Sequence, residues 1–113
     1  MSIKVKFDTR DLVAGLGNLA MTAEPKIVKA VKTNASELQR KEMRDVPVDT
    51  GFLKRSITLT TEDKGLTAIV EPTADYASYL EYGTRYMTAR PYVRANYYEQ
   101  IKQFVKDMEK FVK

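Results

Sequence analysis

The side chains of this 113-residue chain that could take part in chemistry are carboxylates, tyrosines and arginines, because it contains neither histidine nor cysteine. Histidine is the usual general base near neutral pH and the commonest metal ligand, and cysteine thiolates are nucleophiles and metal ligands. Two carboxylates could share acid–base work, but Asp49, Asp75 and Glu81 lie beside turn-forming or aromatic residues that account for them. No nucleophile is paired with a base, so we expect no enzyme, no cofactor and no metal site.

All seven tyrosines lie in one short segment, at Tyr76, Tyr79, Tyr82, Tyr86, Tyr92, Tyr97 and Tyr98. One interpretation is the edge of a hydrophobic core, where the rings pack and the hydroxyls reach water. The other is a protein–protein contact, because tyrosine offers a large contact area at a low entropy cost. Clustering favours the contact, whereas the helical spacing of Tyr76 and Tyr79 favours the core.

Three arginines, Arg85, Arg90 and Arg94, flank Pro91 in the same segment. The simplest interpretation is solvated loop charges. They could instead grip carboxylates of a neighbouring subunit, such as its Glu81, or contact the phosphates of passing DNA. The candidate interface residues are Tyr76, Tyr79, Glu81, Tyr82, Gly83, Thr84, Arg85, Tyr86, Arg90, Pro91, Tyr92 and Arg94.

Length and composition indicate one soluble domain over residues 1–113. The net charge of +4 is spread evenly, with nine basic and seven acidic residues in 1–50 and ten and eight in 51–113. No basic tail or nucleic-acid motif is present, which disfavours DNA binding. No apolar run approaches the roughly 20 residues of a membrane span.

The first half of the chain predicts a strand followed by helices. Residues 2–7 alternate apolar and polar side chains, as in a half-buried strand. Asp8 or Thr9 can cap a short helix, and a long helix with a three- and four-residue apolar stripe restarts near Thr22 and runs to about Arg44.

The second half predicts a hairpin and two further helices. Strands are expected at about 54–62 and 66–72, and a short helix at 75–82 ends at Gly83. Pro91 opens a last helix whose apolar stripe docks on the sheet, with a coiled coil as the less favoured alternative. The predicted fold class is α+β: a small antiparallel sheet of three or four strands, packed by the long helix of the N-terminal half and the C-terminal helix.

Between the long helix and the first hairpin strand the chain reads Pro-Val-Asp-Thr-Gly over residues 47–51. Pro47 stops the helix, and the Asp49 and Thr50 side chains can bond nearby backbone N–H groups. Gly51 allows a positive φ. The segment is therefore expected to form a turn, which could also serve as a contact point for a partner.

Three ordered blocks in the second half of the chain resemble the head–tail connector and tail-component family of HK-type long-tailed double-stranded DNA phages and prophages. The first block matches at Pro47, Asp49, Thr50, Gly51, Leu53, Ser56 and Ile57. The second matches at Tyr76, Ala77, Tyr79, Glu81, Gly83 and Thr84. The third matches at Pro91 and Ala95, with Tyr92 at the usual aromatic position. The N-terminal half agrees only in general layout.

The resemblance implies a structural virion or prophage protein of the phage neck, a neck or tail-completion protein. Such a protein joins the head connector to the tail and forms part of a homo-oligomeric ring for DNA passage. The implied partners are further copies of the chain, the phage portal or connector, and tail proteins, with DNA only as passing cargo and no membrane. The implied location is the virion, after assembly in the host bacterial cytoplasm. Two alternatives remain: a tail-terminator protein, or a small nucleic-acid-binding protein of a mobile element.

Overall fold

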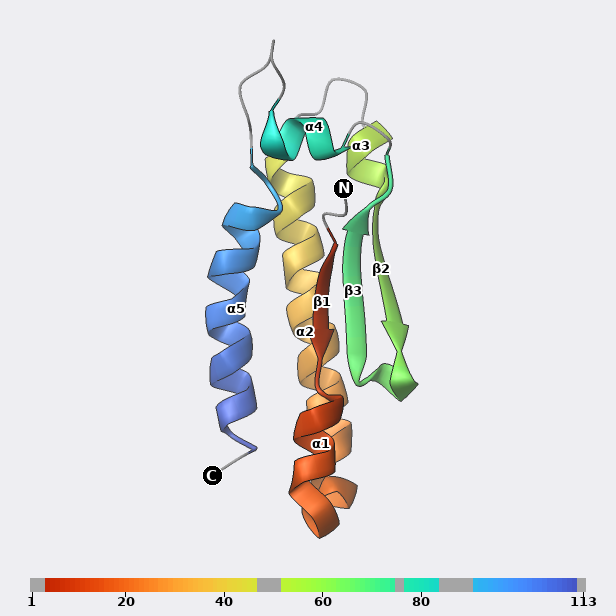
Figure 1. Ribbon diagram of the computed structural model, residues 1–113, viewed down its shortest axis with the longest axis vertical. Helices are drawn as coiled ribbons and strands as arrows, with labels where there is room; N and C mark the ends of the chain where they lie inside the picture. The colour runs from red at the N-terminus through yellow and green to blue at the C-terminus, as the bar shows by residue number, and fades with distance from the viewer. Residues whose placement is uncertain (1–3, 47–51, 75–76, 84–90, 112–113) are drawn as a thin grey trace.

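The computed structural model describes residues 4–46, 52–74, 77–83 and 91–111. They form an elongated α+β unit of 54 × 22 × 21 Å (Figure 1). In chain order its elements are β1 (Val5–Asp8), α1 (Arg10–Leu16), η1 (Gly17–Leu19), α2 (Ala20–Asp45), α3 (Phe52–Arg55), β2 (Ile57–Glu62), η2 (Asp63–Gly65), β3 (Thr67–Pro72), α4 (Ala77–Tyr82) and α5 (Arg94–Glu109).

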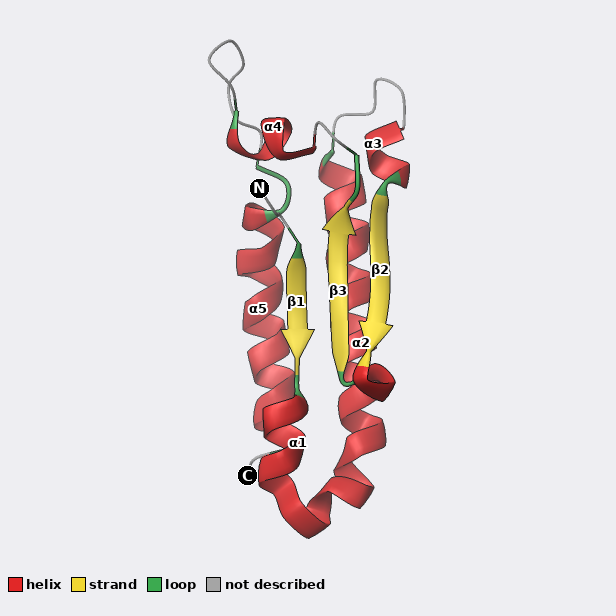
Figure 2. Ribbon diagram, turned by 45° about the vertical axis from the view of Figure 1, so that its right-hand side comes forward, coloured by secondary structure: helices red, strands yellow, loops and turns green. Residues whose placement is uncertain are grey.

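The strands make one antiparallel sheet in the order β1–β3–β2 (Figure 2). Val5 lies opposite Val70 in one pair, and Ile57 lies opposite Pro72 in the other. The predicted antiparallel sheet is thereby confirmed, with three strands in the described part of the chain. Both β1 and β2 are edge strands.

Helix α2 covers one face of the sheet, and α5 lies along α2 (Figures 1 and 2). Ile27, Val31 and Leu38 are fully buried, which confirms the apolar stripe predicted for the long helix. The C-terminal helix packs mainly on α2, where we expected it to dock on the sheet. It reaches the sheet through the Phe104 ring, whose centroid lies 4.9 Å from that of Phe7.

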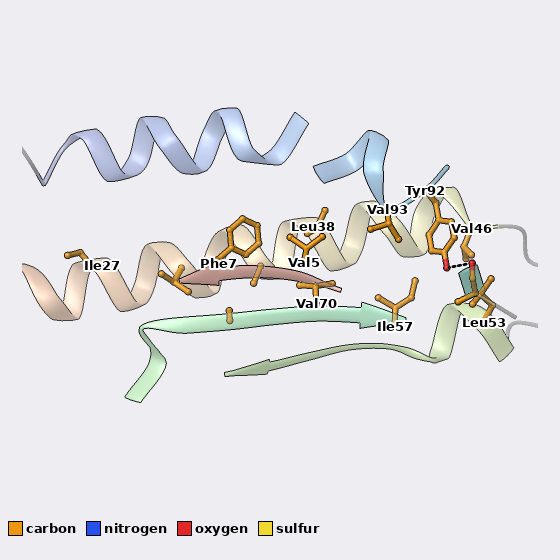
Figure 3. Packing of buried hydrophobic residues seen from close by; sticks show 14 residues of the cluster. Val5, Phe7, Ile27, Leu38, Val46, Leu53, Ile57, Val70, Tyr92 and Val93 are labelled. Atoms are coloured by element: carbon orange, nitrogen blue, oxygen red, sulfur yellow. Dashed lines mark hydrogen bonds between the residues drawn. The ribbon is translucent and has the colours of Figure 1, made fainter. Parts of the chain in front are cut away.

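The core runs along the seam between α2 and the sheet and continues to the end where α3 and α4 lie (Figure 3). Full burial of an aliphatic or aromatic side chain contributes roughly 1.5–3 kcal/mol, so this seam dominates the stability of the fold. Its buried members are Val5, Phe7, Ile27, Val31, Ala35, Leu38, Val46, Leu53, Ile57, Ala68, Val70, Ala77, Tyr92 and Val93.

The first hairpin strand begins later than predicted, because residues 52–55 form the helical turn α3. The Ser56 N–H and hydroxyl both donate to the Leu53 carbonyl, at 3.0 and 2.7 Å. The Ser56 carbonyl in turn accepts the Thr73 N–H at 2.9 Å. Strand pairing therefore starts at Ile57, where the apolar alternation also starts.

Asp8 and Thr9 divide the work at the start of α1. The backbone N–H of Arg10 donates to Asp8 Oδ1 at 3.0 Å, whereas the Thr9 hydroxyl donates to the Leu66 carbonyl at 2.7 Å. Thr9 thus occupies the N-cap position without a side-chain cap bond, and the Asp8 carboxylate accepts the first N–H of the helix instead. The Arg10 guanidinium also binds Asp8 and holds the pKa of that carboxyl well below its usual range.

The turn between β2 and β3 brings Gly65 against α2. Its φ is +92°, and a Cβ at this position would lie 2.7 Å from Val28 Cγ1. Glycine is required twice over, because an L side chain would be strained here and would also overlap with the long helix.

Candidate protein-contact site

Glu81, in α4, is fully buried and serves as the N-terminal cap of α5. Its Oε1 accepts the backbone N–H of Tyr92 at 3.0 Å and that of Val93 at 2.8 Å. Its Oε2 accepts the backbone N–H of Arg94 at 3.0 Å. A carboxylate suits this position, because the first N–H groups of a helix lack partners within it and carry partial positive charge.

The Arg94 side chain, at the surface, also binds Glu81. Its Nε donates to Glu81 Oε2 at 2.7 Å, and its Nη2 donates to the Glu81 backbone carbonyl at 2.8 Å. The Glu81 side chain is 0% exposed and that of Arg94 is 45% exposed. These bonds also correct the predicted start of the last helix, because the N–H groups that follow Pro91 bind Glu81 and α5 begins only at Arg94.

Tyr92 anchors the start of α5 in the core. It is 1% exposed, and its hydroxyl donates to the Ala77 carbonyl of α4 at 3.4 Å. Figure 3 shows this bond at the same end of the core as Val46 and Leu53. Together with Glu81, Tyr92 fixes α4 to the start of α5.

Tyr82 and Arg94 form an exposed pair on this fixed base. The Arg94 guanidinium carbon lies 4.9 Å from the centroid of the Tyr82 ring, which is a cation–π geometry. Tyr82 is 42% exposed. Because Glu81 holds Arg94 in place, the pair presents aromatic and guanidinium surface in one arrangement, and these are the side chains enriched where protein contacts are strongest.

A groove of about 330 Å³ opens beside this pair, between β1 and the start of α5, and we call it the β1–α5 groove. Val5 and Val93 in its lining are 8% and 4% exposed, whereas Tyr98 is 62% exposed. The lining thus includes both buried aliphatic and exposed aromatic side chains. The described lining residues are Lys4, Val5, Lys6, Tyr82, Val93, Arg94, Tyr97 and Tyr98.

Glu42, on α2, is the least satisfied polar group in the described part of the chain. It is 0% exposed, and neither carboxyl oxygen has a hydrogen-bond partner there. Burial, together with the smaller effect of the nearby Glu81 charge, raises the pKa of Glu42 to about 8. At neutral pH this carboxyl is therefore mostly protonated.

A buried polar network joins α2 to α5, and our sequence analysis missed it. Gln100 is 0% exposed, and its Nε2 donates to Asn34 Oδ1 at 2.7 Å and to Glu37 Oε2 at 3.0 Å. Its Oε1 accepts from Lys41 Nζ at 2.9 Å. The position of Asn34 near the apolar stripe of the long helix was the one sequence signal that could have indicated a buried polar contact.

The described residues of the first sequence block join α3 to β2. Leu53 and Ile57 are 3% and 2% exposed, and Ser56 makes the bonds that end α3. Their side chains are committed to the fold. The remaining positions of this block lie outside the described residues: Pro47, Asp49, Thr50 and Gly51.

The candidate interface residues separate into surface and interior. Pro91, Tyr82 and Arg94 are at the surface, and Gly83 follows α4 with a φ of +79°. Glu81 and Tyr92 are buried. Arg94 binds Glu81 of its own chain, whereas the sequence analysis favoured a solvated charge and gave a neighbour's carboxylate as the alternative. Tyr79 belongs to α4. The predicted residues that lie outside the described ranges are Tyr76, Thr84, Arg85, Tyr86 and Arg90.

Two features are absent from the described ranges of the chain. Nowhere within them do three or more acidic, histidine or cysteine side chains gather as a metal site would require. The described helices also include none that is long and apolar enough to span a membrane.

Fold and site thus define an α+β protein in which a buried carboxylate binds an exposed arginine, and this arginine lies over an exposed tyrosine ring. A family model described as "Bacteriophage HK97-gp10, putative tail-component" matches residues 10–83, well over half of the chain. The chain therefore belongs to this family, which confirms the resemblance drawn from the sequence blocks. It is a structural phage tail component, which places it in the virion and in contact with other phage structural proteins. No curated protein and no solved structure gave a significant match.

Proposed function

We propose that this protein acts at the phage neck, where it joins the head connector to the tail as one subunit of a homo-oligomeric ring for DNA passage. The single observation that carries the proposal furthest is the exposed Tyr82–Arg94 pair, fixed from beneath by buried Glu81. Membership of a tail-component family supports it, since such proteins function through contacts with other virion proteins.

In this mechanism the protein is a rigid subunit whose contact surface is already ordered before its neighbours bind. Glu81 binds three backbone N–H groups and one guanidinium, so α4 and α5 present Tyr82 and Arg94 without reorganisation. A contact surface that is ordered before binding loses less side-chain entropy when a partner docks. The whole chain acts as one domain, and neighbouring copies or tail proteins meet this surface.

A tail-terminator role is the second candidate, favoured by the family's description as a tail component. The two roles differ in partner. A neck joiner binds the particle that carries the portal and connector, whereas a terminator binds the end of the tail tube.

The test is light scattering behind size exclusion across concentration, followed by addition of portal–connector particles or of purified tails. Recruitment to the portal–connector particles supports the neck role. Recruitment to tails alone favours the terminator. A monomer that ignores both, yet shifts labelled duplex DNA, overturns both in favour of a nucleic-acid-binding protein.

A further inference from the structure

The free edge of β1 carries backbone groups that can accept another strand. The Thr9 N–H donates to the Leu66 carbonyl at 3.0 Å, on the side facing β3. Because hydrogen-bonding direction alternates along an antiparallel strand, the backbone N–H and C=O of Lys6 point away from β3. The same alternation turns the Ile57 carbonyl of β2 outward, and Gln39 Nε2 donates to it at 2.9 Å. No described strand pairs with the outer edge of β1.

The start of α5 forms the opposite wall of the β1–α5 groove. Figures 1 and 2 show α5 running beside β1, on the side away from β3. Farther along the strand the rings of Phe7 and Phe104 meet at 4.9 Å, so strand and helix close on each other there. The open part of the edge is therefore short and is centred on Lys6.

The charges of the groove have one sign. Lys4, Lys6 and Arg94 line it, and the described lining contains no carboxylate. Asp8 is bound by Arg10, and Glu81 is buried beneath Arg94. Glu71, on the neighbouring strand β3, is outside the lining. A partner that carries carboxylates is complementary to this lining.

We infer that the β1–α5 groove binds a short, extended, acidic segment of another protein, which adds as a strand to the free edge of β1. An edge strand facing a helix is an arrangement that suits this mode of peptide binding. Alternate side chains of the added strand point to opposite faces. Apolar ones lie over Val5 and Val93, and carboxylates lie beside Lys6 on the solvent face.

This inference deepens the proposed function and rests on it, because Tyr82 and Arg94 belong both to the proposed contact surface and to the groove. Aromatic and basic side chains together also suit single-stranded nucleic acid. The outward backbone groups of Lys6 and the buried valines favour a peptide, since bases stack on exposed rings and need no strand edge.

The experiment uses the full chain and a fluorescent peptide in which Glu alternates with Val, followed by fluorescence anisotropy. We expect saturable binding that weakens on the order of tenfold with Lys6→Glu, from charge reversal beside a carboxylate. Tyr98→Ala is expected to weaken it several-fold. The matched control is Lys102→Glu, the same charge change on an exposed residue of α5 that lines a different surface, and it is expected to bind as wild type.

A second pair of variants tests backbone pairing itself. Lys6→Pro removes the outward N–H without removing a bond to β3, whereas Lys6→Ala removes only the side chain. We expect the proline variant to bind the peptide more weakly than the alanine variant while the two unfold at similar temperatures. Equal binding by these two folded variants would overturn strand addition.

Three other results would overturn the inference: no binding of the Glu–Val peptide, equal binding of its Gln–Val counterpart, or tighter binding of a labelled oligothymidine. Failure here can be told from failure of the proposed function. If wild type does not bind the Glu–Val peptide, while Lys6→Glu and wild type are recruited equally to portal–connector particles, only the inference about the groove fails. If wild type itself is not recruited to these particles, the proposed neck role fails.

Discussion

The charge of Glu81 helps to raise the pKa of Glu42, and the fold treats these two buried carboxyls in opposite ways. Glu81 is bound by three backbone N–H groups and by Arg94. Glu42 has no hydrogen-bond partner among the described residues and carries a pKa raised to about 8. One carboxylate therefore stabilises the fold in its charged form, and the other is tolerated in its neutral form.

The first prediction concerns pH. The folded pKa of Glu42 is raised from an ordinary 4.5 to about 8, so its neutral form is favoured by folding. Stability is therefore lost as the pH rises from about 4.5 to about 8, because the unfolded chain releases the Glu42 proton in this range whereas the folded chain keeps it. We expect Glu42→Gln to unfold at a higher temperature than wild type at pH 8 and to converge with it near pH 5.

Thermal unfolding of both proteins across this pH range measures the effect. The difference between the two curves isolates Glu42 from the other titrating groups. If the unfolding temperatures of wild type and Glu42→Gln changed with pH in parallel, the pKa of Glu42 would not be raised, and this prediction would be wrong.

The second prediction concerns the cap of α5. Glu81→Ala leaves three backbone N–H groups without their acceptor, and we expect a loss of about 1–3 kcal/mol in the free energy of unfolding. Urea titration followed by circular dichroism measures it. The control is Glu99→Ala, an exposed carboxylate of α5 in a surface ion pair with Lys41, where we expect a change of about 0–1 kcal/mol.

The third prediction concerns the turn before β3. Gly65→Ala places a Cβ 2.7 Å from Val28 Cγ1 at a φ of +92°, and we expect it to destabilise the fold by about 1–3 kcal/mol. Gly15→Ala is the matched control, because nothing lies within 4 Å of its Cβ inside α1. The control is expected to stabilise by about 0.4–1 kcal/mol, since alanine favours helix and restricts the unfolded chain. Equal effects of the two substitutions would contradict the close approach to α2.

The fourth prediction concerns the buried network between α2 and α5. Gln100→Leu removes the partner of Asn34, Glu37 and Lys41 at once, and we expect a loss of about 2–4 kcal/mol. Gln103→Leu is the control, because Gln103 is exposed and its amide binds only Asp107 in the described part of the chain. If Asn34→Ala and Gln100→Ala proved additive in a double-mutant cycle, the network would not be cooperative.

Sequence reasoning succeeded where one apolar face decides the structure. The stripe of Ile27, Val31 and Leu38 and the alternation of Ala68 and Val70 follow from periodicity alone. These signals are local, because each residue's environment repeats with the helix or strand period. The candidate contact at the segment that includes Tyr82 and Arg94 stays a prediction.

The polar interior could not be predicted in the same way. Glu42, Glu81 and Gln100 are polar residues at 0% exposure, and polarity normally indicates a surface position. What determines their burial is a partner far away in the chain, such as the N–H groups that follow Pro91. Likewise, Phe52–Arg55 form a helical turn because Ser56 donates to the Leu53 carbonyl. The alternation of apolar and polar residues does not predict this contact.

Glu81 and Arg94 hold the two ends of one stretch of chain side by side, whatever the composition of the residues that connect them. In general, lengthening a connection whose ends are already joined is inexpensive, because each doubling of its length adds only about 0.6 kcal/mol of closure entropy. This makes the stretch a permissive site for inserting a peptide tag or reporter.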